Sequence, residues 1–406
     1  MTRLPEGFIP TRHRVNERVQ NMLGRLHRLM PGIEQPDDAR WREIGVAFME
    51  GDPAMDTLLA AMRRHGMRSA RAQFDQALVH GIDAVPDAIP ELREFIVSMA
   101  TPPAWLDTGR VERGAALFRR CGMSALNVGR DVALMGGYQA SAFNRTLILT
   151  GALQKGATRR LAETSQWVLD CTAEGGLAPY SAGWRSTLKV RFIHALVRQS
   201  VAAREDWDME AWGLPVNQPD MAATLYGSLT VQALGARMMG VPQSRRERDD
   251  LAHLTRYVGW LIGVDERWLA DTEEAAAAQL MQLLMSLTNP DETSRMMAQP
   301  LAREPLEREY RNLAFLRSRF EYAKHLSISR AFLGAEAMER LGLPSGVLPW
   351  YPLATFPVTL ARHAVSRALP GGRNRMTRRG RAAQETHVRS LTMDRDAVIG
   401  ESVTAR

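Results

Sequence analysis

Residues 183–198 read GWRSTLKVRFIHALVR, and this stretch decides the fold class. It contains no proline and, after Gly183, no glycine, so it predicts one continuous α-helix. Apolar residues occupy much of its circumference between Leu188 and Val197, which is typical of a helix buried in a protein core. Further helical patterns precede and follow it, so we expect an all-α protein.

Three polar residues share one face of this predicted helix. Arg191, His194 and Arg198 stand at positions i, i+3 and i+7. Burying an imidazole and two guanidinium groups together is costly unless each finds a suitable partner. A haem would supply iron for the imidazole and two propionates for the arginines. The alternative is a hydrogen-bonded core histidine, with arginines that pair with carboxylates of neighbouring helices.

The composition narrows the classes of function. The chain has 406 residues, of which 45% are hydrophobic and 24% charged, so it can bury a large core. The formal net charge is +7, and residues 361–406 contribute ten arginines minus four acidic residues, or +6. The body is therefore close to neutral, which argues against nucleic-acid binding. Only Cys121 and Cys171 are present, which excludes a disulfide framework and a multi-cysteine metal site.

Helical patterns separated by proline and glycine loops cover nearly the whole chain, whereas strand patterns and hairpin turns are scarce. We expect an N-terminal arm over 1–40 with a helix near 14–30, a helical domain over 41–340 and a C-terminal segment over 341–406. The predicted helices cover about 40–50, 53–64, 67–80, 89–99, 108–121, 157–173, 185–203, 220–239, 245–262, 273–287, 304–326 and 327–340.

Residues 341–361 form a long uncharged run. The run is long enough to span a bilayer, but its prolines and glycines disfavour a straight spanning helix. We expect an apolar loop packed on the body. The alternative is an interfacial segment over 341–381, with Trp350 and Tyr351 at lipid headgroups and the following arginines on anionic lipid. The N-terminus shows no apolar region typical of a secretory signal, so we expect a cytoplasmic location, with peripheral membrane contact as the alternative.

A second group of polar residues precedes the opening stretch. Arg160, Glu163 and Thr164 stand at i, i+3 and i+4 of the helix predicted over 157–173, so they lie close together on its surface. Taken alone, this pattern favours an exposed, salt-bridged helix turn. The two helices are joined by a glycine-rich loop and should form an antiparallel pair. Such a pair can hold a flat cofactor, with His194 on one side and Glu163 and Thr164 on the other.

Several motifs follow one another along the chain. They are Trp105-Leu106-Asp107, Thr150-Gly151, Arg160-x-x-x-Thr164, Gly183-Trp184, Arg191-x-x-His194-Ala195-x-x-Arg198, Trp212-Gly213-x-Pro215-x-Asn217-Gln218-x-Asp220 and Tyr257-x-x-x-Leu261-x-Gly263. This ordered set, over about residues 100–270, resembles the latex-clearing-protein/MpaB oxygenase family. Its members include bacterial rubber oxygenases and fungal enzymes that oxidatively cleave a prenyl side chain.

The resemblance implies a globin-like, all-α core around haem b, with additional N- and C-terminal helices. His194 would be the proximal iron ligand, Arg160 and Thr164 would line the haem pocket, and Arg191 and Arg198 would steady the haem and its propionates. The implied chemistry is O₂ activation at iron and oxidation of an isoprenoid-type or other lipid-like C=C bond in a hydrophobic substrate.

Two departures from the family pattern bear on the reaction. Rubber-cleaving relatives carry a lysine directly before the threonine, where this chain has Glu163. They also carry a glutamate, proposed as catalytic base, in a window that corresponds to residues 139–150; this window contains no acid, and Asn144 is nearest to the expected place. Glu163 is then the candidate distal base or weak iron ligand. A haem carrier or sensor without turnover, and a helical membrane-peripheral interaction protein, remain as alternatives.

Overall fold

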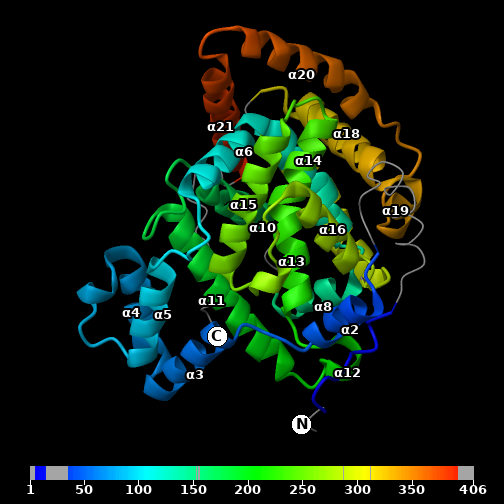
Figure 1. The fold of residues 1–406 in the computed structure, drawn as a ribbon. Coiled ribbons are helices and arrows are strands. Elements are labelled where there is room, and N and C mark those ends of the chain that lie inside the picture. Colours follow the sequence, from blue (N-terminus) through cyan, green and yellow to red (C-terminus); the bar gives the residue numbers. More distant parts are fainter. Residues whose placement is uncertain are drawn as a thin grey trace.

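The computed structural model describes residues 5–14, 35–151, 153, 156–286, 288–310 and 312–391. Over these residues the chain is helical and has no strand, which confirms the all-α prediction (Figure 1). The helix predicted near 14–30 falls in the part that is not described.

The elements alternate between long helices and short connecting turns. In chain order they are α2 (Asp38–Ala47), α3 (Pro53–His65), α4 (Met67–His80), η1 (Ile82–Ala84), α5 (Pro90–Ala100), α6 (Thr108–Val128), η2 (Gly129–Leu134), α7 (Met135–Gly137), α8 (Ser141–Leu149), α10 (Ala157–Cys171), α11 (Ala182–Ala202), α12 (Met209–Trp212), α13 (Gln218–Tyr226), η3 (Gly227–Val231), α14 (Gln232–Met238), α15 (Arg245–Ile262), η4 (Glu266–Trp268), α16 (Glu273–Leu284), α17 (Glu292–Glu307), α18 (Ala314–Leu333), α19 (Ala335–Arg340), α20 (Trp350–Ala368) and α21 (Gly372–Leu391). The elements η2 and η3 are single π-helical turns that pack against each other.

Local signals explain where several helices begin and end. Asp52 caps α3 by accepting a hydrogen bond from the backbone N–H of Met55. Pro53 occupies the first helical position, where a backbone N–H would have no partner within the helix, so proline is tolerated there. The helix α15 begins with a capping box of Ser244 and Glu247 and ends at Gly263 with a left-handed backbone. Because these signals are local, the predicted bounds of α3, α4 and α15 agree with the structure to within one residue.

The centre of the fold is α6, against which α14, α15 and α21 all pack. Glycine allows the closest of these crossings. A Cβ atom on Gly114 of α6 would lie 2.5 Å from the carbonyl oxygen of Asp250 in α15, and a Cβ atom on Gly380 of α21 would overlap the carbonyl oxygen of Arg119 in α6. Helix α21, although it ends the described chain, is thus part of the packed body.

The helices α10 and α11 form the expected pair across a glycine-containing loop. Near that loop, the indole N–H of Trp167 donates to the hydroxyl of Thr187 at 3.0 Å, and the Cys171 sulfur lies 3.3 Å from the same hydroxyl. The helix α11 also packs against α3, α8 and α15. The side chain of Arg191, one turn before His194, contacts both Asp52 at the start of α3 and Leu261 of α15.

The C-terminal third differs from the sequence prediction. The predicted helices over 304–326 and 327–340 are wrong in their bounds, because α17 ends at Glu307 and α18 runs without a break from Ala314 to Leu333. The apolar loop expected over 341–361 is also wrong from Trp350 onward, where α20 begins. Pro352 falls in the first turn of α20, where a backbone N–H would have no partner within the helix. Pro357 lies inside α20 and removes one of its backbone hydrogen bonds. Within the described part of the chain, no helix has the length and apolar character needed to cross a membrane.

Candidate functional site

His194 lies in the second half of α11 and keeps part of its surface accessible. It is nevertheless enclosed enough that burial, aided by the positive charge of Arg198, lowers the pKa of His194 to about 4. Neither ring nitrogen has a hydrogen-bond partner among the described residues, and Nδ1 is fully buried. A neutral imidazole that no hydrogen bond engages is suited to bind a metal ion.

Arg191 lies one turn before His194 and is buried against the start of α3. Its Nε donates to Asp52 Oδ2 at 2.6 Å, and its Nη2 donates to Asp52 Oδ1 at 2.7 Å, so the two side chains form a bidentate ion pair. The remaining nitrogen donates to the carbonyl oxygen of Leu261 at the end of α15. The guanidinium thus joins three helices: α11, α3 and α15.

Arg198, one turn after His194, makes a second link to α3. Its Nε contacts Asp56 at 3.2 Å, and its Nη1 donates to the carbonyl oxygen of Val216 at 2.6 Å. Burial raises the pKa of Asp56 above its usual value although Arg198 opposes the shift. Both arginines therefore pair with carboxylates of a neighbouring helix, as the alternative interpretation of the sequence expected. Their predicted contact with haem propionates stays a prediction.

Sequence reasoning missed the partners Asp52 and Asp56. A signal for Asp52 was present, since Asp-Pro directly before an apolar helical pattern is typical of a helix N-cap. No local pattern indicates that this cap also binds an arginine 139 residues away.

The residues predicted on α10 have unequal surroundings. Arg160 donates from Nη1 to the hydroxyl of the buried Tyr138 at 3.3 Å. Glu163 accepts from Arg159 at 3.0 Å, one turn away, and is half-buried. Thr164 is exposed. The salt-bridged helix turn that the sequence favoured for this stretch alone is present as Arg159–Glu163.

The contact between Trp167 and Thr187 sets the heights of these residues relative to His194. Arg160 stands seven residues before Trp167, and His194 stands seven residues after Thr187. In an antiparallel pair with about 1.5 Å rise per residue, both are displaced by about 10 Å along the same direction. Arg160 and His194 therefore lie at similar heights on α10 and α11. Half-buried apolar side chains near this height on α11 include Val190, Ile193 and Val197. The helix α8, which packs against α11, carries the half-buried Leu147 and Ile148.

Asn144 of α8 takes a structural position. Its side chain is buried, and Nδ2 donates to the carbonyl oxygen of Tyr138 at 2.7 Å and to the hydroxyl of Thr293 at 3.3 Å. These bonds tie α8 to the start of α17. The neighbouring Arg145 of α8 forms an ion pair with Asp291 at 2.8 Å.

Residues 123–367 match the family described as "ER-bound oxygenase mpaB/B'/Rubber oxygenase, catalytic domain". The chain belongs to this family. The match confirms the resemblance inferred from the motifs, and it covers α8, α10 and α11 in full.

Two relatives illustrate the similarity. The rubber oxygenase of Streptomyces sp. (strain K30) is 25% identical over 238 residues, which are 57% of this chain and 58% of that protein. The aligned part therefore spans less than two thirds of the relative's length. The solved structure of latex clearing protein in the closed state has the same fold with a TM-score of 0.59 at 18% identity, over 86% of this chain and 90% of that one.

Several residues of the motifs quoted from the sequence meet at one structural junction. Gln218 donates to the carbonyl oxygens of Gly51 and Gly263, so it links the start of α3 to the end of α15. A Cβ atom on Gly263 would lie 2.7 Å from Nε of Arg191 and would also overlap the Asp52 carboxylate. The absence of a side chain at Gly263 thus leaves room for the ion pair between Arg191 and Asp52.

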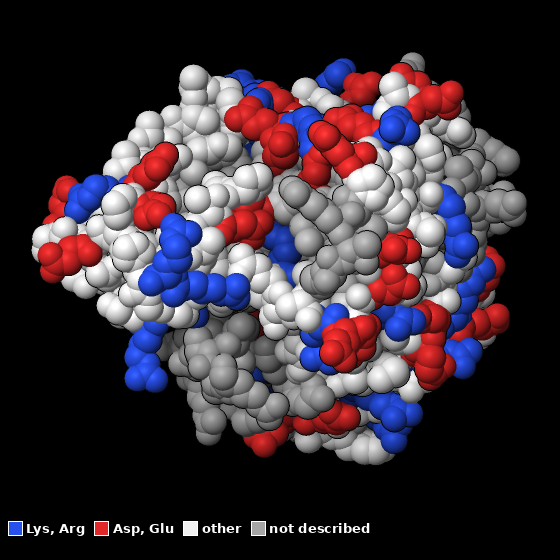
Figure 2. All heavy atoms as spheres, turned by 90° about the horizontal axis from the view of Figure 1, so that it is seen from below, with Lys and Arg blue, Asp and Glu red and all other residues white. Residues whose placement is uncertain are grey.

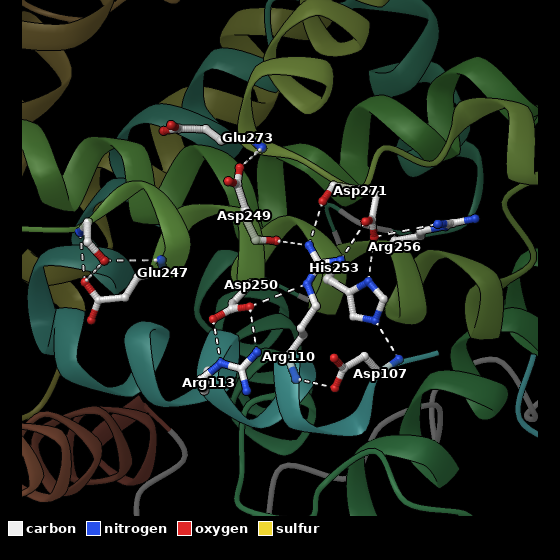
Figure 3. A network of polar contacts seen from close by, with 11 residues as sticks. Asp107, Arg110, Arg113, Glu247, Asp249, Asp250, His253, Arg256, Asp271 and Glu273 are labelled. Carbon is white, nitrogen blue, oxygen red and sulfur yellow. Dashed lines mark hydrogen bonds and ion pairs between the residues drawn. The ribbon is translucent and has the colours of Figure 1, made fainter. Parts of the chain in front are cut away.

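The motif Trp105-Leu106-Asp107, which lies before the matched residues 123–367, contacts His253 of α15 (Figure 3). The backbone N–H of Asp107 donates to Nε2 of His253 at 2.9 Å, and Nδ1 lies 2.5 Å from Asp271. This network, which includes Arg110 of α6, joins the turn before α6 to α15 and to Asp271 in the turn that precedes α16. Burial raises the pKa of Asp271, but hydrogen bonds from Arg110 and His253 more than offset it, so the pKa lies below its usual value. The network therefore holds these segments together.

Proposed function

We propose that this protein binds haem b through His194 and uses O₂ to oxidise a hydrophobic, unsaturated substrate of isoprenoid or lipid-like character. The observation that carries the proposal is the state of His194, whose imidazole is neutral, enclosed and without a hydrogen bond to any described residue. Membership of the oxygenase family supports the reaction class.

The residues present fit such a group in part. Buried Nδ1 of His194 lacks a partner, and half-buried apolar side chains of α8 and α11 offer a surface for a flat, apolar ring. Arg191 and Arg198, by contrast, are engaged by Asp52 and Asp56. Haem propionates would have to share the arginines with these carboxylates or find other cations.

Each remaining residue has a role that its contacts allow. Haem iron would supply the activation of O₂. Arg160, held by Tyr138, would present a fixed positive charge, and the exposed hydroxyl of Thr164 is available to donate a hydrogen bond. Glu163 would accept a proton once its bond to Arg159 is broken. The half-buried apolar side chains would bind the alkene.

The first test is the haem content of the purified protein, after reconstitution with hemin, by its visible spectrum and a pyridine haemochrome assay. We expect one haem b per chain in the wild type and loss of most of it in His194→Ala. His65→Ala, at an exposed histidine of α3, is the matched control and should bind as the wild type does. Haem-free wild type, or undiminished haem in His194→Ala, would refute the proposed ligand.

A second candidate, a haem carrier or sensor without turnover, is favoured by one observation. Residues 139–150 contain no carboxylate, and Asn144 is bound to Tyr138 and α17. Oxygen uptake by the haem-loaded protein with an unsaturated isoprenoid separates the two. Uptake that depends on the substrate supports the oxygenase, and haem binding without uptake supports the carrier. The cytoplasmic location expected from the sequence remains a proposal.

A further inference from the structure

Helix α20 has an unusual distribution of polarity. The stripe that faces the body of the protein is small or polar, whereas the opposite face is apolar and exposed. The inward stripe consists of Pro352, Thr355, Thr359, His363 and Ser366, all buried or half-buried. The exposed face carries Leu353, Phe356, Val358, Leu360 and Val365. A surface helix in water normally shows the reverse pattern.

The packing contacts of α20 fix which of its sides faces the body of the protein. The helix packs between α18 and α21 along the outer edge of the molecule (Figure 1). Gly240, with a positive φ, gives room to the backbone of α20, because a Cβ atom there would lie 2.5 Å from the carbonyl oxygen of Phe356. Arg367 donates to the carbonyl oxygen of Pro242 at 2.9 Å. These contacts turn the apolar side of α20 away from the body.

The apolar surface continues onto the first turns of α18. Leu313, Phe315, Leu316 and Phe320 are all more than half exposed. The rings of Phe320 and Trp350 lie 5.9 Å apart between centroids, which joins the two helices. We call this combined surface, from Leu313 to Phe320 and from Trp350 to Val365, the apolar face. Most of the exposed large apolar side chains in the described part of the chain belong to it or border it. Exposed apolar surface of this extent is typical of a binding site.

Charge within the apolar face is of one sign. Its two segments, 313–320 and 350–365, contain the exposed Arg317, Arg319 and Arg362 and no acidic residue. Glu321, which directly follows the face, is half-buried and pairs with Lys324. The face of the molecule seen from below is different, since acidic and basic side chains intermingle there (Figure 2). The apolar face therefore suits an anionic partner.

We propose that the apolar face docks this protein onto the surface of an anionic lipid bilayer, with α20 lying in the interface and not crossing it. Apolar side chains flanked by arginines, with Trp350 and Tyr351 at the start of the helix, are the features of an interfacial amphipathic helix. A second copy of the chain fits less well. A two-fold symmetric contact would bring the arginines of one copy against those of the other, and the apolar face itself carries no acidic residue to pair them.

The test is binding to vesicles, followed by co-sedimentation. We expect the wild type to bind vesicles of phosphatidylcholine with phosphatidylglycerol at least tenfold more tightly than vesicles of phosphatidylcholine alone. The double variant Leu353→Glu/Leu360→Glu should lose binding by tenfold or more. Because both side chains are exposed, we expect the double variant to fold as the wild type does. Circular dichroism spectra of the two proteins check this. Val97→Glu/Met238→Glu, which changes exposed apolar residues elsewhere, is the matched control and should bind as the wild type does.

Three results would overturn the proposal. They are absence of vesicle binding by the wild type, equal binding to both kinds of vesicle, and undiminished binding by the double variant. If the wild type is a dimer without vesicles and the double variant a monomer, a second copy covers the apolar face instead. Haem content measured on the same preparations keeps this outcome separate from that of the proposed function.

Discussion

At the scale of single residues, the surroundings of a side chain decide which chemistry it offers. His194 is neutral because burial disfavours its charged form, and it is available because no residue in the described part of the chain binds its nitrogens. His253 is also on a helix that was predicted correctly, yet both of its nitrogens are engaged, by Asp107 and Asp271. Histidine is thus a candidate metal ligand at position 194 and a structural link between segments at position 253.

Glu163 gives a prediction at this scale, which rests on the proposed function. If it accepts a proton during turnover, Glu163→Gln should lower the rate of oxygen uptake by about a hundredfold and remove the acidic limb of its pH profile. Haem content should not change. The measurement is substrate-dependent oxygen uptake between pH 5 and pH 8.

Arg159→Gln is the matched control for this substitution, because it breaks the ion pair with Glu163 but keeps the carboxylate. We expect its activity to stay near that of the wild type. Equal losses in both variants would mean that the ion pair, and not the carboxylate, matters. An unchanged pH profile in Glu163→Gln would remove Glu163 from the reaction.

At the scale of elements, buried ion pairs set how α11 sits against its neighbours. The pair of Arg191 and Asp52 is almost fully enclosed and joins α11 to α3. Asp52→Asn would leave a buried guanidinium without its counter-charge, which typically costs about 3–5 kcal/mol. We expect a fall of that size in the free energy of unfolding, measured by urea denaturation at pH 7.

Asp206→Asn offers the comparison for Asp52→Asn. Asp206 also pairs with an arginine, Arg204, but both side chains are exposed. Loss of this surface pair should change stability little. A similar effect of the two substitutions would show that enclosure of Arg191 contributes nothing to the fold.

At the scale of the whole molecule, buried histidines make stability depend on pH. Burial lowers the pKa of His194 and His363 to about 4 and that of His387 to about 3. In the unfolded chain these groups take up protons below about pH 6.5, whereas in the folded chain they take them up only near pH 4 or below. Burial also raises the pKa of Asp131 to about 6, which favours the folded state as the pH falls and offsets part of the loss.

We therefore expect the protein, prepared without added hemin, to lose a few kcal/mol of unfolding free energy between pH 6.5 and pH 4, since one pKa unit corresponds to about 1.4 kcal/mol. Urea denaturation at half-unit steps of pH measures the loss. His387→Gln should flatten the curve, while His65→Gln, at an exposed site, should leave it unchanged. Stability that is constant or rises over this range would contradict the prediction.

Local order in the sequence determined much of the fold. Spacing at three and four residues placed Arg191, His194 and Arg198 on one helix face, and cap residues marked the ends of α3 and α15, because both depend only on neighbours within a turn or two. The ordered motifs also sufficed to identify the oxygenase family.

Only the tertiary structure decided the rest. The partner of Arg191 is 139 residues away, Asn144 is bound by a helix that follows it by about 150 residues, and α20 presents its apolar side outward because of where α18, α21 and Gly240 lie. Such outcomes depend on which surfaces meet when helices pack, and this is set by distant segments together. A local pattern specifies which side of a helix is apolar, but only packing decides whether that side is buried or left exposed.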